Sequence, residues 1–168
     1  MDDLGKSRRL DAIPDQATAV RWAVRAGVVG ADEQVGEQDL AALHRFREDA
    51  WQVLAAAATE RPAPASALHG LRTAIEDATR RAHFVIEGRG GRWSAGDGRS
   101  AIHDRIALRA AETLQSGALA TLRECHRCTA LFLDDRRGAA RRFCRAGTCG
   151  NRDKVERHRA RRRAEQSG

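Results

Sequence analysis

The four cysteines constrain the fold of this chain more than any other feature of its sequence. They form two close pairs, Cys125 with Cys128 and Cys144 with Cys149, and fifteen residues separate the pairs. A tetrahedral Zn²⁺ ion binds four such thiolates at about 2.3 Å, and two short knuckles joined by a hairpin supply them without a large core. The spacing therefore predicts one zinc site with four cysteine ligands.

Two disulfide bonds are the alternative explanation of the same pairs. Disulfides persist in oxidising compartments, whereas the sequence opens Met-Asp-Asp-Leu, without the charged and apolar leader of an exported protein. We therefore expect a cytoplasmic protein and favour the metal. Because four thiolates complete the coordination shell, the zinc would be structural, and His126 and His158 would not be ligands. A catalytic zinc, with three protein ligands and a water, is the less favoured alternative.

The excess positive charge of the chain belongs to its cysteine-containing end. Residues 123–168 hold 14 basic and 6 acidic side chains, a net charge of +8, whereas residues 1–122 hold 16 basic and 17 acidic ones. A concentrated positive field beside a neutral segment indicates phosphate binding, although a solubilising tail would have the same composition. No run of apolar residues is long enough to cross a membrane, so we expect no membrane partner.

Residues 1–122 predict a mainly helical domain. Apolar residues recur at helical spacing, and Pro62 and Pro64 separate the two longest periodic segments, which should pack as an antiparallel pair. The predicted helices cover residues 14–26, 37–59, 65–81 and 101–114. The residues of the last helix that we expect to face inward are Ile102, Ile106, Ala110, Thr113 and Leu114.

One β-hairpin interrupts the helical pattern. Residues 83–87 favour a strand, residues 88–91 are glycine-rich turn residues, and residues 92–94 would return antiparallel. The expected fold class is therefore mainly α with one small β-hairpin. We expect a helical domain over residues 1–122 and a treble-clef-like zinc finger with four cysteine ligands over residues 123–168.

Three tryptophans are candidates for lining a ligand pocket in the helical domain. Trp22, Trp51 and Trp93 could surround a pocket between the helices and the hairpin, but large aromatic residues more often fill a core. The histidines of this domain are scattered, and no arrangement of nucleophile, acid and base is recognisable. We therefore do not expect an enzyme.

A basic helix is expected to begin near Cys149 and to run to about Arg163. Val155 would anchor this helix to the small finger core and leave a basic side free, where asparagine suits adenine and arginine suits guanine or phosphate. Asn151 and Arg152 could instead cap the helix or orient the cysteines. The candidate nucleic-acid contacts are Arg141, Arg142, Arg145, Asn151, Arg152, Lys154, His158, Arg161 and Arg162.

The tetrad Cys149-Gly150-Asn151-Arg152 resembles the motif that gives the CGNR zinc finger its name. The resemblance covers Leu122 to Arg163 and includes the segments Leu131-Phe132-Leu133-Asp134 and Arg141-Arg142-Phe143. It departs at the first pair, which is tighter than the family's spacing, and at Phe143, where tryptophan is common. Such fingers are typically the C-terminal domains of bacterial transcription regulators, which implies the same context for this chain.

The order of helices and hairpin before the finger is similar to the ABATE domain, which commonly accompanies the CGNR finger. The resemblance implies a stress-induced transcription regulator whose helical domain senses a small-molecule effector or forms a homodimer. We therefore expect the finger to bind DNA. The alternative is a zinc-stabilised protein-interaction or RNA-binding module without sequence-specific DNA binding.

Overall fold

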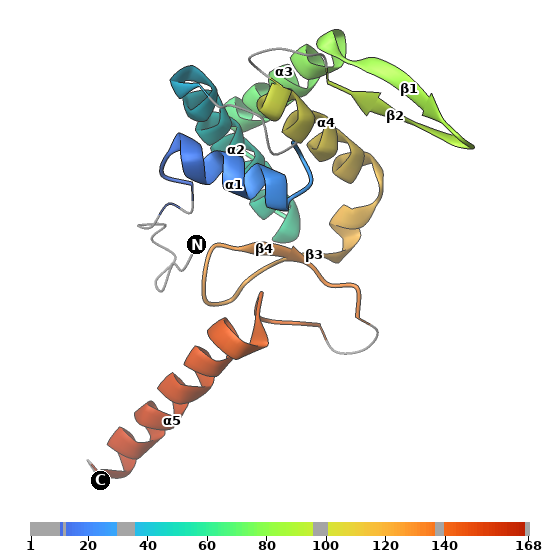
Figure 1. Cartoon of the computed structure of the whole chain (residues 1–168). Coiled ribbons are helices and arrows are strands. Elements are labelled where there is room, and N and C mark those ends of the chain that lie inside the picture. The colour runs from blue at the N-terminus through green and yellow to red at the C-terminus, as the bar shows by residue number, and fades with distance from the viewer. Residues whose placement is uncertain (1–10, 12, 30–35, 96–100, 137–139, 167–168) are drawn as a thin grey trace. The chain divides into compact units, whose positions relative to one another are not determined.

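The computed structural model describes residues 11, 13–29, 36–95, 101–136 and 140–166, to which the structural statements below refer. The chain divides into two compact units (Figure 1). One unit is Ala12–Ala120, and the other includes Thr121–Gly168. No helix in the described ranges is both long and apolar enough to span a bilayer.

Helices and one hairpin make up the first unit. Its elements are α1 (Gln16–Arg25), α2 (Glu37–Ala58), α3 (Ala65–Arg81), β1 (His83–Glu87), β2 (Gly90–Ser94) and α4 (Ala101–Gln115). Helices α2, α3 and α4 lie side by side, and the β1–β2 hairpin extends beyond the ends of α3 and α4 (Figure 1). The strands pair antiparallel, from His83 opposite Ser94 to Glu87 opposite Gly90. The predicted helices, the antiparallel pair and the hairpin are confirmed.

Local sequence explains where α1 begins and ends. The Asp15 side chain accepts a hydrogen bond from the backbone N–H of Thr18 at 2.7 Å, as an N-cap does, and this bond lowers the pKa of Asp15. At the other end Gly27 has φ +65, which a glycine adopts without strain. The N–H of Val28 then reaches back to the carbonyl of Ala23 at 2.8 Å, which closes the helix in a Schellman-type turn.

Two apolar clusters hold the first unit together. One consists of Ile13, Ala19, Ala23, Leu43 and Ile102, and the other of Phe46, Leu71, Ala78, Ala95, Ala107 and Leu108. The prediction that Thr113 faces inward is wrong, because this residue is exposed and its hydroxyl donates to the Arg109 carbonyl at 2.9 Å. Helix α4 instead buries Ala107 and Leu108.

A buried ion pair joins the end of α3 to the beginning of α4. The Asp104 carboxylate, with its side chain 4% exposed, accepts two hydrogen bonds of 2.7 Å from the Arg81 guanidinium. These hydrogen bonds raise the pKa of Arg81. The His103 ring lies 3.6 Å from the same carboxylate and packs edge-on against Phe46. The Arg81 guanidinium thus pairs with both carboxylate oxygens of the buried Asp104.

Removing the Arg81 guanidinium should destabilise the first unit, because it leaves the buried Asp104 carboxylate without this ion pair. Breaking a buried ion pair costs about 3–5 kcal/mol, but Arg81 is 49% exposed, so screening by water reduces the loss expected for Arg81→Gln to about 2 kcal/mol. The measurement is urea unfolding followed by tryptophan fluorescence, because all three tryptophans belong to the first unit.

The neighbouring substitution Arg80→Gln is the control. Arg80 pairs with Asp77 at 2.7 Å, but this side chain is 71% exposed, and an exposed pair contributes less than about 1 kcal/mol. Equal losses in the two variants would contradict the special role of Arg81.

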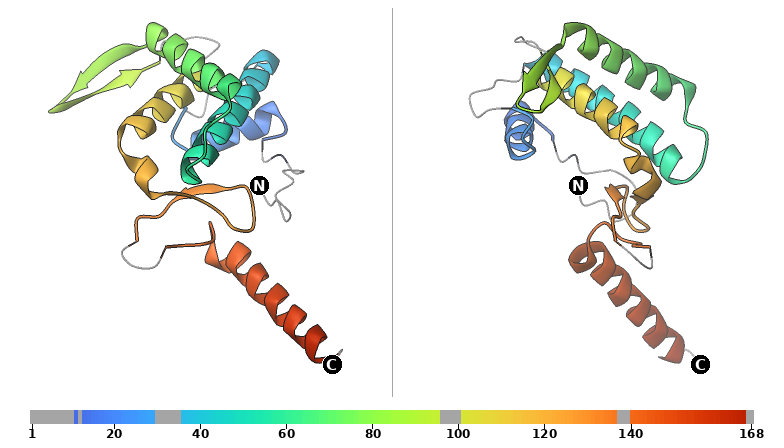
Figure 2. Two further views of the ribbon diagram at one scale, coloured as in Figure 1. Left: turned by 180° about the vertical axis from the view of Figure 1, so that it is seen from behind. Right: turned by 90° about the vertical axis from the view of Figure 1, so that its right-hand side faces the viewer.

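The second unit combines a short hairpin with a long helix. A 3₁₀ turn η1 (Ala118–Thr121) leads into β3 (Leu122–Glu124), which pairs antiparallel with β4 (Leu131–Leu133). A π-helical turn η2 (Ala146–Gly150) then continues directly into α5 (Asn151–Gln166). Figure 2 shows that α5 extends away from the β3–β4 hairpin. The fold class is mainly α as predicted, but the described residues contain two small hairpins rather than one.

Candidate metal centre

The four cysteine sulfur atoms converge on one point in the second unit. All of them lie within 4.8 Å of one another, and the Sγ atoms of Cys128, Cys144 and Cys149 are 3.7 Å apart pairwise. A tetrahedral ion with sulfur ligands at about 2.3 Å requires edges of about 3.8 Å between sulfurs. Three of the sulfur atoms are thus spaced as one tetrahedral zinc ion requires, and the Cys125 sulfur lies close to all three. The four cysteines form the site of a single structural zinc.

The same geometry excludes the disulfide alternative. All four cysteines are free thiols. A disulfide bond needs two sulfurs at about 2.05 Å, far shorter than the 3.7 Å that separates the sulfurs of the three cysteines named above. The pairs therefore act together as one site and not as two cross-links.

Backbone hydrogen bonds place the two knuckles next to each other. Cys125 directly follows β3, and its N–H donates to the Ala130 carbonyl at 3.0 Å, which closes the first knuckle. The next residue, His126, donates its N–H to the Arg142 carbonyl at 3.0 Å and so links the first knuckle to the second. Cys149 lies in η2, immediately before α5. The metal site therefore joins the hairpin to the first turn of the helix.

The metal-free thiols differ in acidity. Burial raises the pKa of Cys125, but backbone N–H donors, the strongest from Cys144, outweigh burial and lower its pKa to about 6. Burial raises the pKa of Cys128 and of Cys144 above the usual thiol range. Near neutral pH the cluster therefore offers a ready thiolate at Cys125 and retains protons at Cys128 and Cys144, which a metal ion must displace.

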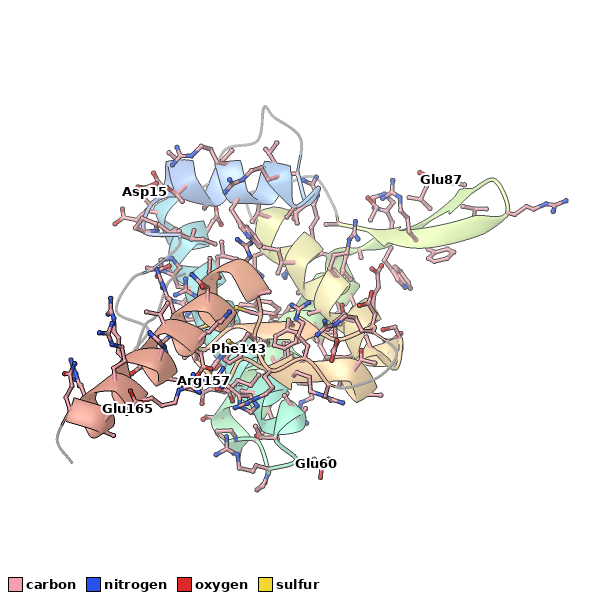
Figure 3. All side chains as sticks on the ribbon, turned by 90° about the horizontal axis from the view of Figure 1, so that it is seen from below. Asp15, Glu60, Glu87, Phe143, Arg157 and Glu165 are labelled. Carbon is pink, nitrogen blue, oxygen red and sulfur yellow. The ribbon has the colours of Figure 1, made fainter. Side chains whose placement is uncertain are left out.

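Few apolar side chains surround the cysteines. Among the residues that the structure describes, Ala130, Phe132 and Phe143 are partly buried and pack on Cys125, Cys128 and Cys149. In Figure 3 sulfur atoms are visible beside Phe143, near the start of α5. A core of this size cannot hold a domain by itself, so metal binding supplies much of the folding free energy.

Arg141 belongs to the interior of the finger. Its guanidinium lies 4.3 Å from the centre of the Phe132 ring and donates to the carbonyls of Phe143 (2.8 Å) and Cys144. Its backbone N–H donates to the Asp134 carboxylate at 2.7 Å, a bond that lowers the pKa of Asp134. The predicted contact of Arg141 with a nucleic acid would have to compete with these bonds, which hold the loop that carries Cys144.

Val155 does not anchor α5 to the finger, so that prediction is wrong. The residue is 39% exposed, and no residue of α5 is buried. Instead, Arg127 in the first knuckle forms an ion pair with Glu156 at 2.6 Å. The helix is therefore attached through η2, the metal site and this ion pair, because it has too few apolar residues to pack.

The other candidate nucleic-acid contacts lie on the surface of the second unit, with Arg152 half-buried. The exposed members on α5 are Asn151, Lys154, His158, Arg161 and Arg162, which recur at three- and four-residue steps and so share one side of the helix. We call this set the α5 stripe. Arg142 and Arg145 are exposed just before η2, and Arg142 lies 5.7 Å from the centre of the Phe143 ring.

The three tryptophans lie in three different places. Trp22 packs against the cluster that contains Leu43 and Ile102. Trp51 lines a pocket at the turn between α2 and α3. Trp93 lines a separate cleft between β2 and α4. The structure therefore does not bring them together around the one pocket that the sequence suggested.

Comparison with protein families gives two matches that together span most of the chain. The model of the CGNR zinc finger matches residues 121–162. The model of ABATE, described as "Putative stress-induced transcription regulator", matches residues 2–123. No curated protein matches the chain.

Zinc content should separate the cysteines from the nearby histidine. We expect one zinc per purified chain, loss of that zinc in Cys149→Ser, and unchanged zinc in His126→Ala, because the four sulfurs complete the shell. Elemental analysis after dialysis measures the metal. Zinc retained in Cys149→Ser but lost in His126→Ala would contradict this ligand set.

Zinc affinity should rise steeply with pH. Since the pKa values of Cys128 and Cys144 are raised, binding near neutral pH must release at least those two protons, and lowering the pH lets protons compete better with the metal. Two released protons correspond to about 100-fold in affinity per pH unit. Competition with a coloured chelator between about pH 7 and 8 measures this slope. A slope of tenfold or less would contradict the protonation states inferred here.

Proposed function

The chain belongs to the ABATE family and carries a CGNR zinc finger, and we propose that it is a transcription regulator whose finger binds double-stranded DNA. In this proposal residues 123–168 form the DNA-binding domain and residues 1–122 the regulatory domain. One observation carries the proposal: a metal site fixes the first turn of a basic helix that has no buried residue.

The dimensions of α5 suit the major groove. Its 16 residues make a helix about 24 Å long, and the major groove, about 12 Å wide, admits an α-helix. Because none of its residues is buried, the α5 stripe needs no rearrangement within the helix to meet a ligand. The helix can therefore enter a groove while η2 and the cysteines stay outside it.

Charge is distributed unevenly around α5. Asp153 and Glu156 lie on roughly the opposite side of the helix from the α5 stripe at 3.6 residues per turn. Each is paired with an arginine, Asp153 with Arg157 at 2.9 Å and Glu156 with Arg127 at 2.6 Å. Over its first three turns the stripe is therefore free of carboxylates that would repel phosphate, and Glu165, near the end of α5, is the acidic residue on its side. This distribution supports binding by the stripe side.

The proposal assigns different roles to the exposed basic and polar residues. Asn151, at the start of α5, suits an adenine edge, and Arg161 and Arg162 suit guanine or phosphate. Arg142 and Arg145 would contact the DNA backbone beside the groove. Phosphate contacts dominate this set, and a single finger covers few base pairs, so sequence specificity requires a homodimer or a partner.

Salt dependence and a charge-matched pair of variants test the proposal. We expect affinity for duplex DNA to fall about tenfold or more between about 50 and 200 mM salt. The double variant Arg161→Ala, Arg162→Ala should weaken binding and reduce the salt slope by about two. Fluorescence anisotropy with a labelled duplex measures both quantities.

The double variant Arg159→Ala, Arg163→Ala is the control, because it removes the same charge from the other side of the same helix. We expect it to lose less than about threefold in affinity, since these side chains would face away from the groove. Equal losses in the two double variants would refute binding through the stripe. Binding that ignores salt, or a preference for structured RNA, would refute duplex DNA as the partner.

A further inference from the structure

The β1–β2 hairpin exposes an apolar face that the DNA-binding proposal does not use. Phe84, Ile86 and Trp93 are 52%, 79% and 45% exposed. They share one face, because Phe84 and Ile86 alternate along β1 and Phe84 lies opposite Trp93. The rings of Phe84 and Trp93 meet edge-on, with 5.2 Å between their centres. Since the hairpin extends beyond the ends of α3 and α4 (Figure 1), this face marks an interaction surface.

The outer edge of β1 has no neighbouring strand. Among the residues that the structure describes, this sheet contains only β1 and β2, and β2 is the strand that lines the cleft beside α4. Natural proteins protect such edges with lysine, proline or a β-bulge. The sequence of β1, His-Phe-Val-Ile-Glu, contains neither residue, and its register with β2 has no bulge. The edge is therefore suited to accept another strand.

The two-residue turn between β1 and β2 determines which backbone groups reach this edge. Gly88 in the turn has φ +59, as the first central residue of a type II′ turn requires. The residues that flank such a turn, here Glu87 and Gly90, form a hydrogen-bonded pair, and hydrogen-bonded pairs then alternate along an antiparallel ladder. The N–H and C=O groups of Phe84 and Ile86 therefore point away from β2.

The residues of β1 are complementary to those of a second, antiparallel copy of the same strand. A two-fold axis at Val85 places Phe84 opposite Ile86 of the second copy, and His83 opposite Glu87 of the second copy. The outward N–H and C=O groups of Phe84 then meet those of Ile86 in the second copy. The backbone and the side chains therefore require the same register.

The paired side chains attract each other in this register. An aromatic residue opposite a β-branched one, as Phe84 is to Ile86, stabilises an antiparallel pair. Glu87 uses its Oε1 for the pair with Arg92 at 3.0 Å, and its other oxygen can accept a hydrogen bond from His83 of the second copy.

The outer edge of β2 lacks this complementarity. The same operation on β2 would place Arg92, its central residue, opposite itself, and like charges opposite each other destabilise a pair. Gly90 and Gly91 also contribute no side chain to such a contact. The edge that can pair with itself is therefore β1.

We propose that two copies of this chain associate through their β1 edges into one four-stranded antiparallel sheet, in the order β2-β1-β1-β2. Each copy uses its own β1 edge, so the assembly closes at a dimer. This association depends on the hairpin alone. Only its consequence, that a dimer offers two fingers to one DNA molecule, rests on the function proposed above.

The short edge sets the expected strength of the dimer. A contact between two strands of five residues buries on the order of several hundred Å², less than the roughly 1,200–2,000 Å² of stable interfaces. We therefore expect a reversible dimer with a dissociation constant on the order of 10–100 µM.

Sedimentation equilibrium of the full zinc-loaded chain tests the association. The average mass should rise from that of one chain toward that of two between about 1 and 500 µM, without larger species. A chain that stays monomeric at about 500 µM, or that forms larger assemblies, would overturn the proposal.

A matched pair of lysine substitutions assigns the dimer to the β1 edge. Ile86→Lys puts a charge opposite Phe84 of the second copy and should weaken the dimer about tenfold or more. Leu68→Lys is the control, because Leu68 is an apolar residue of α3 that is 48% exposed and lies outside the hairpin. It should change the dissociation constant less than about twofold. Thermal melting checks that both variants fold, and equal effects on the dimer would count against the β1 edge.

Cross-linking tests the register. Val85→Cys places two thiols across the two-fold axis, where the Cα atoms of opposed residues lie about 4.5–5.5 Å apart, within the range of a disulfide. Mild oxidation of the zinc-loaded variant should give a covalent dimer on a non-reducing gel. Arg92→Cys, at the β2 residue opposite Val85, should remain uncross-linked, as should the unchanged chain. No dimer from Val85→Cys, or equal dimer from Arg92→Cys, would overturn this register.

The two proposals fail separately. A chain that dimerises but ignores DNA would refute the proposed function and leave the β1 pairing intact. DNA binding by a chain that stays monomeric at about 500 µM would refute only the β1 pairing. If both hold, Ile86→Lys should bind a duplex with room for two fingers less cooperatively than the unchanged chain does.

Discussion

The spacing of four sulfur atoms is the constraint on which the second unit depends. Ala130, Phe132 and Phe143 contribute the apolar packing around the cysteines, and α5 contributes no buried residue. Hydrogen bonds within this unit, including those from Arg141, hold the loops that carry the cysteines. These loops keep their positions only while the four sulfurs are bound together. Metal coordination therefore replaces the core that a segment of this size cannot build.

The first unit is stabilised in a different way. Its helices bury two apolar clusters, and the pair between Arg81 and Asp104 adds a directional link at the junction of α3 and α4. None of these interactions involves a metal or a thiol. The two parts of the chain should therefore respond to different conditions, the first to heat and denaturants and the second also to chelators and oxidants.

Most of the helices could be predicted from the sequence, because the glycines and prolines that end a helix and the spacing of its apolar residues are local features of the chain. The zinc ligands could be predicted because cysteine is scarce and its pair spacing is informative. Two side-chain orientations could not. Thr113 satisfies its hydroxyl on its own helix, and Val155 lies on a helix with nothing apolar to pack against. The role of Arg141 depends on its contacts with the Phe132 ring and the Cys144 carbonyl in the folded finger. The distances between these residues along the sequence do not reveal such contacts.

The attachment of α5 at its first turn has a mechanical consequence. A rigid rod of about 24 Å that pivots at one end moves its far end by about 4 Å for each 10° of rotation. That displacement exceeds the rise of about 3.4 Å between successive base pairs. Small changes in the geometry around Cys149 would therefore cause larger displacements at the C-terminal end of α5. The precision with which the four sulfurs are positioned therefore limits the precision with which the C-terminal end of α5 is positioned.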